Sequence, residues 1–114
     1  MKKTGAVEAL AALAQDNRLD VFRLLVQAGP AGMSAGALST ALDIAPNALT
    51  FHFDRLRKAG LVSVRREGRS MIYAAQYATM NALLSYLTEN CCGGAASARA
   101  TEAKPIRKRA IVVA

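Results

Sequence analysis

The two cysteines of the chain, Cys91 and Cys92, are adjacent and stand at the end of a helical pattern, directly before two glycines. Neighbouring side chains on a helix diverge by about 100°, so two thiols within a helix would not converge on one ion. The glycines allow the backbone to leave helical geometry and bring the sulfurs together. Soft thiolates select soft, thiophilic ions. The pair therefore suits trivalent arsenic or antimony and does not suit Mg²⁺ or Ca²⁺.

The chemistry of this pair leaves several interpretations open. Inorganic arsenite commonly takes three thiolates, and the chain supplies only two. A third thiol would come from glutathione or from a second copy of the chain, or the ligand would be an organoarsenical that needs two bonds. A redox switch is an alternative, although a disulfide between adjacent residues is strained and the C-terminal end of a helix disfavours the thiolate. Otherwise the cysteines are small hydrophobic residues without a role.

Composition and charge place the chain among small globular proteins with a polyanionic partner. It has 114 residues, of which 53% are hydrophobic, so one domain with a modest core is expected. The formal net charge of +7 favours nucleic acid as the partner, although the same charge would also serve solubility. No segment approaches the ~18 apolar residues of a membrane span. We therefore expect a cytoplasmic protein with no membrane partner and with reduced cysteines.

Hydrophobic spacing predicts a mainly α chain of about five helices with one small β-hairpin. The helices are expected within residues 5–15, 16–29, 31–44, 46–60 and 77–92. Between the last two, the apolar segments Leu61–Val64 and Met71–Tyr73 flank the polar stretch RREGRS, with Gly68 near the tip of a two-stranded wing. Residues 1–92 would form one winged helix-turn-helix domain, and residues 93–114 a flexible basic tail.

Local signals set the expected ends and apolar faces of these helices. Asp16 and Ser34 are expected N-caps, and Pro46 suits the first turn of its helix. Gly29 and Gly60 mark helix ends. The expected apolar faces are Val7, Leu10, Ala11 and Ala14 in the first helix, Leu19, Phe22, Leu25 and Val26 in the second, Leu38 and Leu42 in the third, and Tyr77, Met80, Leu84 and Leu87 in the last.

The helix expected at residues 46–60 has a face suited to reading DNA. At about 100° per residue, Leu49, Phe53 and Leu56 form a buried stripe. Small and amide side chains on the other side can approach base edges in a major groove, and basic ones can contact the flanking phosphates. The outward candidates for DNA contact are Asn47, Ala48, Thr50, Phe51, Arg55 and Lys58. An ordinary solvated helix face is the alternative interpretation.

Two further residues of this helix bear on its function. His52, the only histidine, lies at the margin of the buried stripe and is a candidate for DNA contact. A structural or phosphate-bonding role is favoured for it over metal ligation. Asp54 would face phosphate unfavourably, so it is expected to pair with Lys58 four residues later.

The stretch RREGRS would supply the basic tip of the wing. Arg65, Arg66 and Arg69 surround its turn, and arginines there can contact phosphates or enter a narrow minor groove. A merely soluble hairpin tip is the alternative, which three arginines within five residues make less favourable. Glu67 reduces the positive field slightly.

Two segments carry a resemblance to a known family. NRLDVFRLL, followed by LSTALDIAPNALTFHFDRLRKAGLVSVRREGRSMIY, resembles the arsenic-repressor (ArsR/SmtB) family of winged-helix repressors. The block TFHFDRLRKAGLV followed by RREGRSMIY is the strongest match, and the resemblance covers residues 5–92. It implies a homodimer built by the first and last helices, bound to an inverted-repeat operator. It also implies that a soft metal or metalloid causes release.

The chain departs from the family at two of its known metal sites. Many arsenic sensors of the family have a Cys-Val-Cys motif before the recognition helix, where this chain has SAGALSTALD. Zinc sensors of the family use carboxylates and histidines on the last helix, which here offers only Glu89. The pair Cys91 and Cys92 resembles the site of another branch of arsenic sensors, which carry a Cys-Cys pair at the end of the last helix.

The sequence therefore predicts a DNA-binding transcriptional repressor that trivalent arsenic or antimony releases from its operator through Cys91 and Cys92. The alternative is a redox-responsive or effector-free winged-helix regulator. No organic cofactor is expected. An enzyme is not expected either, because the chain has no Cys-x-x-Cys motif, no glycine-rich anion loop before a helix and no second histidine.

Overall fold

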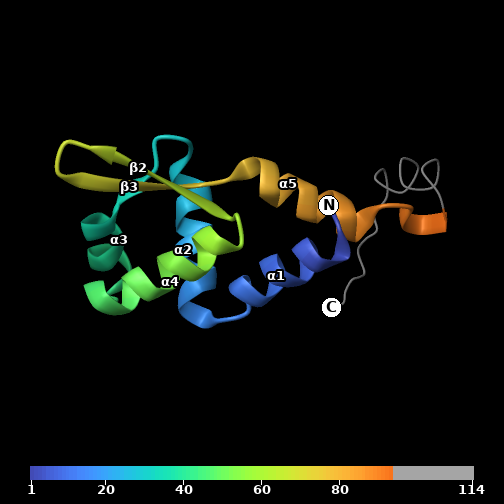
Figure 1. Cartoon of the computed structure of the whole chain (residues 1–114), viewed down its shortest axis with the longest axis horizontal. Helices are drawn as coiled ribbons and strands as arrows, with labels where there is room; N and C mark the ends of the chain where they lie inside the picture. The colour runs from blue at the N-terminus through green and yellow to red at the C-terminus, as the bar shows by residue number, and fades with distance from the viewer. Residues whose placement is uncertain (94–114) are drawn as a thin grey trace, which may run out of the picture. The chain divides into compact units, whose positions relative to one another are not determined.

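The computed structural model describes residues 1–93, which form helices, a small sheet and one 3₁₀ turn (Figure 1). The helices are α1 (Lys3–Leu13), α2 (Asp16–Ala28), α3 (Ala35–Leu42), α4 (Pro46–Lys58) and α5 (Tyr77–Thr88), the strands are β1 (Met33–Ser34), β2 (Val62–Glu67) and β3 (Ser70–Ala75), and the 3₁₀ turn is η1 (Cys91–Gly93). This order confirms the predicted winged helix-turn-helix: α3 and α4 joined by a short turn, then a hairpin.

The chain divides into two compact units after Leu84. The first, Met1–Leu84, contains α1 to α4, the sheet and most of α5. The second begins at Ser85 and contains the end of α5 and the cysteine pair. The flexible basic tail predicted for residues 93–114 falls, apart from Gly93, outside the described residues.

Several helix ends follow the predicted local chemistry. The Ser34 hydroxyl accepts a hydrogen bond from the Ala37 N–H (3.1 Å), and Pro46 occupies the first turn of α4. Gly29 has φ 83° just after α2. The cap of α2 differs from the prediction, because the Gln15 side chain accepts from the Arg18 N–H (2.9 Å) while Asp16 is the first helical residue. An amide oxygen one residue upstream therefore replaces the expected carboxylate.

The buried face of α1 differs from the one predicted, and that of α2 differs in part. The buried residues of α1 are Ala6, Ala9 and Ala12, whereas Val7 and Leu10 are exposed. Alanine has so little side chain that α1 can approach α2 and α4 closely on this face. In α2, Phe22 and Leu25 are buried as predicted, whereas Leu19 is 44% exposed and Val21 is buried instead. Tertiary packing, rather than the size of the apolar side chains, therefore decides which face of each helix is covered.

The core of the first unit lies between the helices and the sheet. Leu49, Phe53 and Leu56 are buried on α4, as the 100° spacing predicts. Other fully buried side chains come from α2, α3 and the start of the hairpin: Val21, Leu25, Leu38, Leu61 and Val62. The Phe53 ring stacks on the Tyr73 ring with centroids 3.7 Å apart, which joins α4 to β3.

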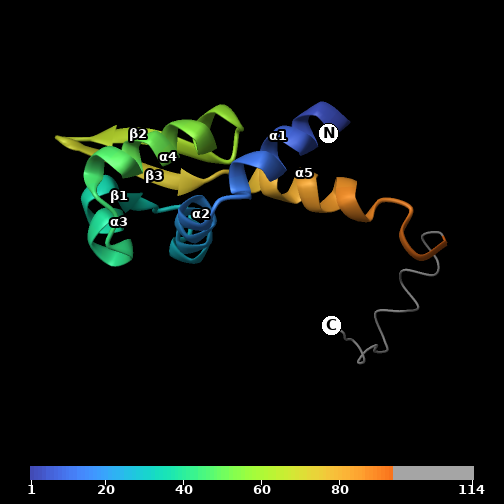
Figure 2. The ribbon, with the colours of Figure 1, turned by 90° about the horizontal axis from the view of Figure 1, so that it is seen from below.

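The sheet has three antiparallel strands in the order β1-β3-β2, so the predicted two-stranded wing is extended by one short strand. β2 and β3 pair from Val62 opposite Ala75 to Glu67 opposite Ser70. β1 pairs with the other edge of β3 through Met33 opposite Tyr73. Figure 2 shows β1 beside β3, next to α3. Two residues are too few for a period-2 pattern, which explains why the sequence did not indicate this strand.

None of the helices in the described part of the chain, residues 1–93, is long and apolar enough to cross a membrane.

Candidate nucleic-acid interface

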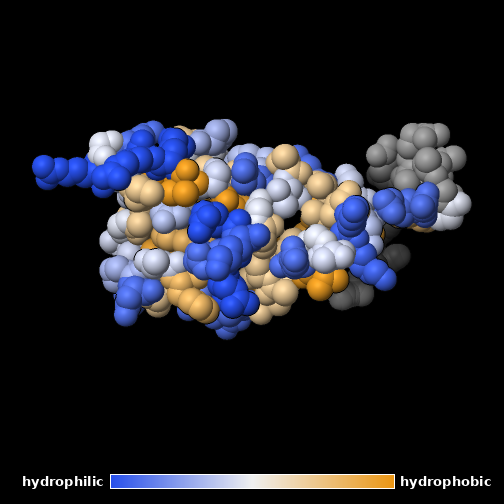
Figure 3. Space-filling model, viewed as in Figure 1, coloured by the Kyte–Doolittle hydropathy of each residue, from blue (hydrophilic) through white to orange (hydrophobic). Residues whose placement is uncertain are grey.

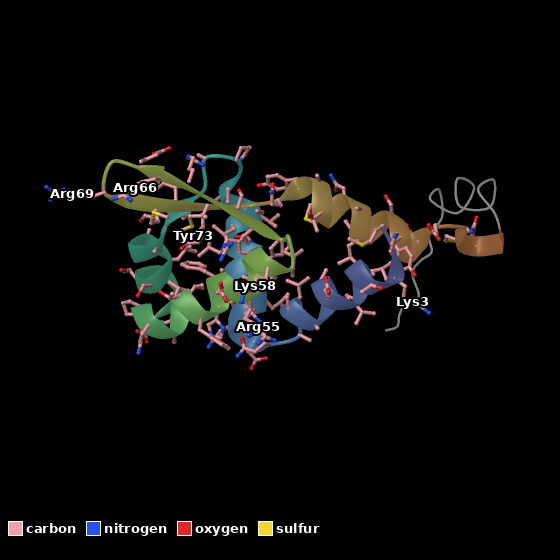
Figure 4. The ribbon with its side chains drawn as sticks, in the orientation of Figure 1. Lys3, Arg55, Lys58, Arg66, Arg69 and Tyr73 are labelled. Carbon is pink, nitrogen blue, oxygen red and sulfur yellow. A yellow bond between two sulfur atoms is a disulfide. The ribbon has the colours of Figure 1, made fainter. Side chains whose placement is uncertain are left out.

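The outward face of α4 carries every residue that the sequence assigned to it. Asn47, Ala48, Thr50 and Phe51 are exposed in its first half, and Arg55 and Lys58 in its second. The first half is neutral, and the two cations of the second half belong to the basic C-terminal turn of α4. Figure 4 labels Arg55 and Lys58 on α4. Such a face can place neutral side chains near base edges and cations near phosphates.

Two polar side chains in the first half of α4 are held by their own backbone. The Asn47 Oδ1 accepts from the Ala48 N–H (2.9 Å), and the Thr50 hydroxyl donates to the Pro46 carbonyl (3.0 Å). The Asn47 bond uses only the amide oxygen, so its N–H groups are not engaged by it, and the Thr50 oxygen keeps its capacity to accept. Both side chains thus make one hydrogen bond within α4 while staying exposed to a partner.

The acidic residue of this face is neutralised within the helix. Asp54 pairs with Lys58 (Oδ2–Nζ 3.2 Å), as predicted, and also with Arg57 three residues along the helix (Oδ1–Nη2 3.1 Å). The hydrogen bond from Lys58, together with the charges of Lys58 and Arg57, lowers the pKa of Asp54. The carboxylate is thus ionised and paired at neutral pH, so it repels an approaching phosphate less than a lone charge would.

His52 lies beneath the surface, with 7% of its area exposed. Its Nδ1 has no hydrogen-bond partner among the described residues. Burial first, and then the charge of the nearby Arg18, lowers its pKa. Arg18 is itself buried, and its Nε donates to the Ala12 carbonyl (2.6 Å). This burial favours the structural role of His52 over a contact with DNA.

The buried His52 gives a pH prediction. In the unfolded chain its pKa lies near 6.5, and in the fold it lies lower, so the unfolded state takes up the proton first as pH falls. The free energy of unfolding should therefore decrease below about pH 6.5, by at most about 1.4 kcal/mol per pH unit. Urea denaturation between pH 8 and pH 5 measures this slope.

The matched variant His52→Gln removes the titration. Its unfolding free energy should vary less with pH than that of the wild type in the same range, because carboxylate titrations are shared by both proteins. Parallel pH profiles for the two proteins would contradict the assignment to His52.

The three wing arginines play different local roles. The Arg65 guanidinium donates to Glu67 (Nε–Oε2 2.7 Å) and to the Ala31 carbonyl (Nη2–O 2.7 Å), so it ties the wing to the loop before β1. The Arg66 Nε donates to the Gly68 carbonyl (3.2 Å) at the tip. Arg69 is exposed and makes no hydrogen bond or ion pair within residues 1–93. Of the three, Arg66 and Arg69 are therefore the more available for phosphate.

Figures 3 and 4 show a hydrophilic tip at the end of the hairpin. Figure 4 shows Arg66 and Arg69 at the end of the hairpin, with Arg69 extending away from it. Figure 3 shows strongly hydrophilic side chains projecting from the same end of the molecule. A cationic tip that extends beyond the body of the domain is suited to reach the backbone of a duplex bound by α4.

The cysteine pair lies in a short turn after α5. Asn90 and Cys92 have φ values of 60° and 66°, so the chain leaves helical geometry as the sequence predicted. The two sulfurs are joined in a disulfide, which differs from the expected reduced thiols. Cys91 is half-buried and Cys92 is exposed. Within residues 1–93, no group of three or more His, Cys, Asp or Glu side chains is placed to hold a metal ion.

The donor set fits a ligand with two bonds to sulfur. The backbone at Cys91 and Cys92 permits the sulfurs to come together, so the reduced pair could bind one thiophilic centre. A site made of three thiolates is not formed by the described residues.

Comparison with known proteins agrees with the fold. Residues 13–65 match the family model described as a helix-turn-helix domain. The transcriptional activator HlyU of Vibrio cholerae is 31% identical over 87 residues, which cover 76% of this chain and 78% of HlyU. The structure of HlyU from Vibrio cholerae N16961 has a TM-score of 0.61 and 33% identity, covering 76% of this chain and 97% of that one.

Two further solved structures are similar. An ArsR-like transcriptional regulator from Rhodococcus sp. RHA1 has a TM-score of 0.66 and 30% identity, with 74% of this chain and 76% of that chain covered. The homodimeric winged helix-turn-helix DNA-binding domain Mb0332 from Mycobacterium bovis has a TM-score of 0.62 and 24% identity, with 76% and 81% covered. The relatives are named as transcriptional regulators, the class of protein that the sequence predicted. The chain therefore belongs to the ArsR family of winged helix-turn-helix transcriptional regulators.

Proposed function

We propose that the protein is a dimeric repressor that binds an inverted-repeat operator and is released when trivalent arsenic or antimony binds Cys91 and Cys92. The observation that carries the DNA-binding part is the outward face of α4, whose neutral first half is followed by Arg55 and Lys58. Repression is part of the proposal, since the curated relative HlyU is named an activator.

The proposed complex places α4 in the major groove. Asn47, Ala48, Thr50 and Phe51 would face base edges, while Arg55 and Lys58 contact the flanking phosphates. Arg66 and Arg69 would extend from the wing tip to the adjacent backbone or minor groove, with Arg65 supporting the wing from within. His52 would support α4 from the buried side.

The dimer is proposed from exposed apolar side chains on the terminal helices. Val7 and Leu10 of α1 and Leu84 and Leu87 of α5 are all exposed within one chain. Large apolar residues clustered on a helix surface favour contact with another subunit. The homodimeric state of the Mb0332 domain, which shares the fold, accords with this. Two-fold symmetry would match the two α4 helices to the half-sites of an inverted repeat.

The effector step is a ligand exchange at sulfur. A trivalent organoarsenical with two hydroxyl groups would form two As–S bonds to reduced Cys91 and Cys92, and each exchange would release one water formed from a hydroxyl group and a thiol proton. An inorganic arsenite would need a further thiol from glutathione or the partner subunit. Closing this small ring would fix the turn after α5, and binding there would be coupled to DNA affinity.

The test is DNA release measured by fluorescence anisotropy. Protein kept reduced is bound to DNA from its own upstream region and titrated with arsenite, antimonite or a trivalent monosubstituted arsenical, with zinc as control. Release is expected with the organoarsenical. Release by arsenite as well would indicate a third ligand, and tight binding unaffected by any of the three would overturn metalloid sensing.

The double variant Cys91→Ser, Cys92→Ser isolates the proposed site. It should bind the same DNA with unchanged affinity, since neither residue lies on α4 or the wing. It should also show no release at metalloid concentrations that release the wild type completely. The control Ser85→Ala alters an exposed side chain in the same unit and should leave release intact. Release retained by the double variant would show that the metalloid acts elsewhere.

A second candidate is redox response, which the Cys91–Cys92 disulfide favours. An oxidant would take two electrons and two protons from the thiols as the S–S bond forms. This candidate predicts that peroxide alters DNA affinity in the wild type and not in the double serine variant. The metalloid proposal predicts that peroxide leaves the DNA affinity unchanged and abolishes only the release of DNA by the metalloid.

A further inference from the structure

One aromatic side chain of the recognition face stands apart from its neighbours. Phe51 is 55% exposed on α4, while Phe53, two residues on, is buried in the core. Single exposed apolar residues are common on protein surfaces. Phe51, however, lies in the middle of the face that the proposed function places against base edges, among small and polar residues. An exposed phenyl ring on this face is therefore a candidate for contact with a base.

The Phe51 ring is held in place from two sides. Its centroid lies 5.8 Å from the His52 centroid in an edge-to-face arrangement, and His52 is buried. The Arg55 guanidinium carbon lies 5.8 Å from the Phe51 centroid, within cation–π range. Arg55 and Phe51 therefore lie on the same side of α4, and in the proposed complex both would face the same groove. The ring needs little further ordering to make a contact.

The chemistry of the major groove leaves one partner for such a ring. Base edges there present hydrogen-bond donors and acceptors, which a phenyl group cannot satisfy and would desolvate. The C5 methyl group of thymine is the apolar exception in unmodified DNA. Of the four outward residues in the first half of α4, Asn47, Ala48, Thr50 and Phe51, Phe51 alone has a large apolar side chain, and it is 55% exposed.

We propose that Phe51 is a specificity-determining residue that reads the methyl group of one thymine in each half-site. This rests on the proposed function, because it requires α4 to enter the major groove. The contact selects an A·T pair at one position of the half-site through burial of the methyl group against the ring. Arg55 positions the ring and contributes affinity that does not depend on sequence.

The test removes the methyl group from DNA and the ring from protein. Duplexes are first selected from a randomised library with the wild-type protein. Each thymine of the selected half-site is then replaced, one at a time, by deoxyuridine, which lacks only the methyl group. At one position the wild type should bind about fourfold more weakly per half-site, as expected for one buried methyl-sized group.

The variant Phe51→Ala should be indifferent to that same replacement. Because Phe51 is exposed, its truncation should leave the fold intact. The control Leu19→Ala, at an exposed apolar residue of α2, should keep the wild-type sensitivity to deoxyuridine.

Two results would overturn the inference while leaving DNA binding in place. The first is wild-type binding that is unchanged by deoxyuridine at every thymine. The second is a Phe51→Ala variant that loses as much affinity as the wild type when the same thymine is replaced. Failure of the wild-type protein to enrich any duplex would instead overturn the proposed DNA-binding function, and the reading of thymine with it.

Discussion

Replacing Arg66 and Arg69 together by alanine should weaken DNA binding about 60-fold per half-site at about 0.1 M salt, and leave the fold unchanged. Both side chains are exposed at the wing tip, and neither is paired with a carboxylate in residues 1–93. Each contact with a phosphate releases counterions, so the slope of log affinity against log salt should become shallower by about 1.8 per subunit. Anisotropy titrations from about 0.05 to 0.3 M salt measure both quantities.

A matched control removes the same number of positive charges from another part of the protein. The double variant Lys3→Ala, Arg23→Ala removes two exposed cations from α1 and α2, and should change the salt slope much less. Arg65→Ala tests the supporting role in the wing: it breaks the hydrogen bonds to Glu67 and to the Ala31 carbonyl. Equal salt slopes for the wild type and the wing variant would mean that the wing tip does not contact DNA.

The second large effect concerns Gly32→Ala, which should lower the free energy of unfolding by about 3 kcal/mol. Gly32 has φ 72°, a backbone conformation that costs an L-residue about 1–2 kcal/mol. A Cβ at this position would also meet the Tyr73 carbonyl and the Ile72 side chain. The new methyl group could be accommodated only if β1 moves away from β3. Urea denaturation followed by circular dichroism measures the loss.

The variant Gly68→Ala separates the two causes. Gly68 has φ 62° at the wing tip, and a Cβ there would meet nothing within 4 Å. It should therefore cost only the backbone term, about 1 kcal/mol. Similar losses at the two glycines would show that β1 yields easily and that its pairing with β3 contributes little.

The parts of the fold that the sequence predicted correctly are those that local chemistry decides. Ser34 caps α3, Pro46 opens α4, and Leu49 and Phe53 are buried at the predicted spacing. The pairing of Asp54 with Lys58 was predictable because both lie on one helix. For the same reason, the outward residues of α4 could be named before the structure was known.

The rest depended on contacts between distant segments. β1 exists because Met33 pairs with Tyr73, 40 residues later, and a two-residue strand has no pattern of its own. Arg65 was predicted as a DNA contact like its neighbours, but its bond to the Ala31 carbonyl comes from across the sheet. The bond between Cys91 and Cys92 was not expected from the sequence, since the expected compartment favours thiols.

The central position of Tyr73 determines how far apart the two DNA-reading elements are. Tyr73 pairs with Met33 on one side and Val64 on the other, and its ring stacks on Phe53 of α4. Tyr73 thus joins α4 to the sheet that contains the hairpin, and this packing sets the separation between α4 and the wing. In the proposed complex, this separation would fix the number of base pairs between the bases read by α4 and the backbone contacted by the wing. An operator with one base pair inserted between them should therefore lose one of the two contacts.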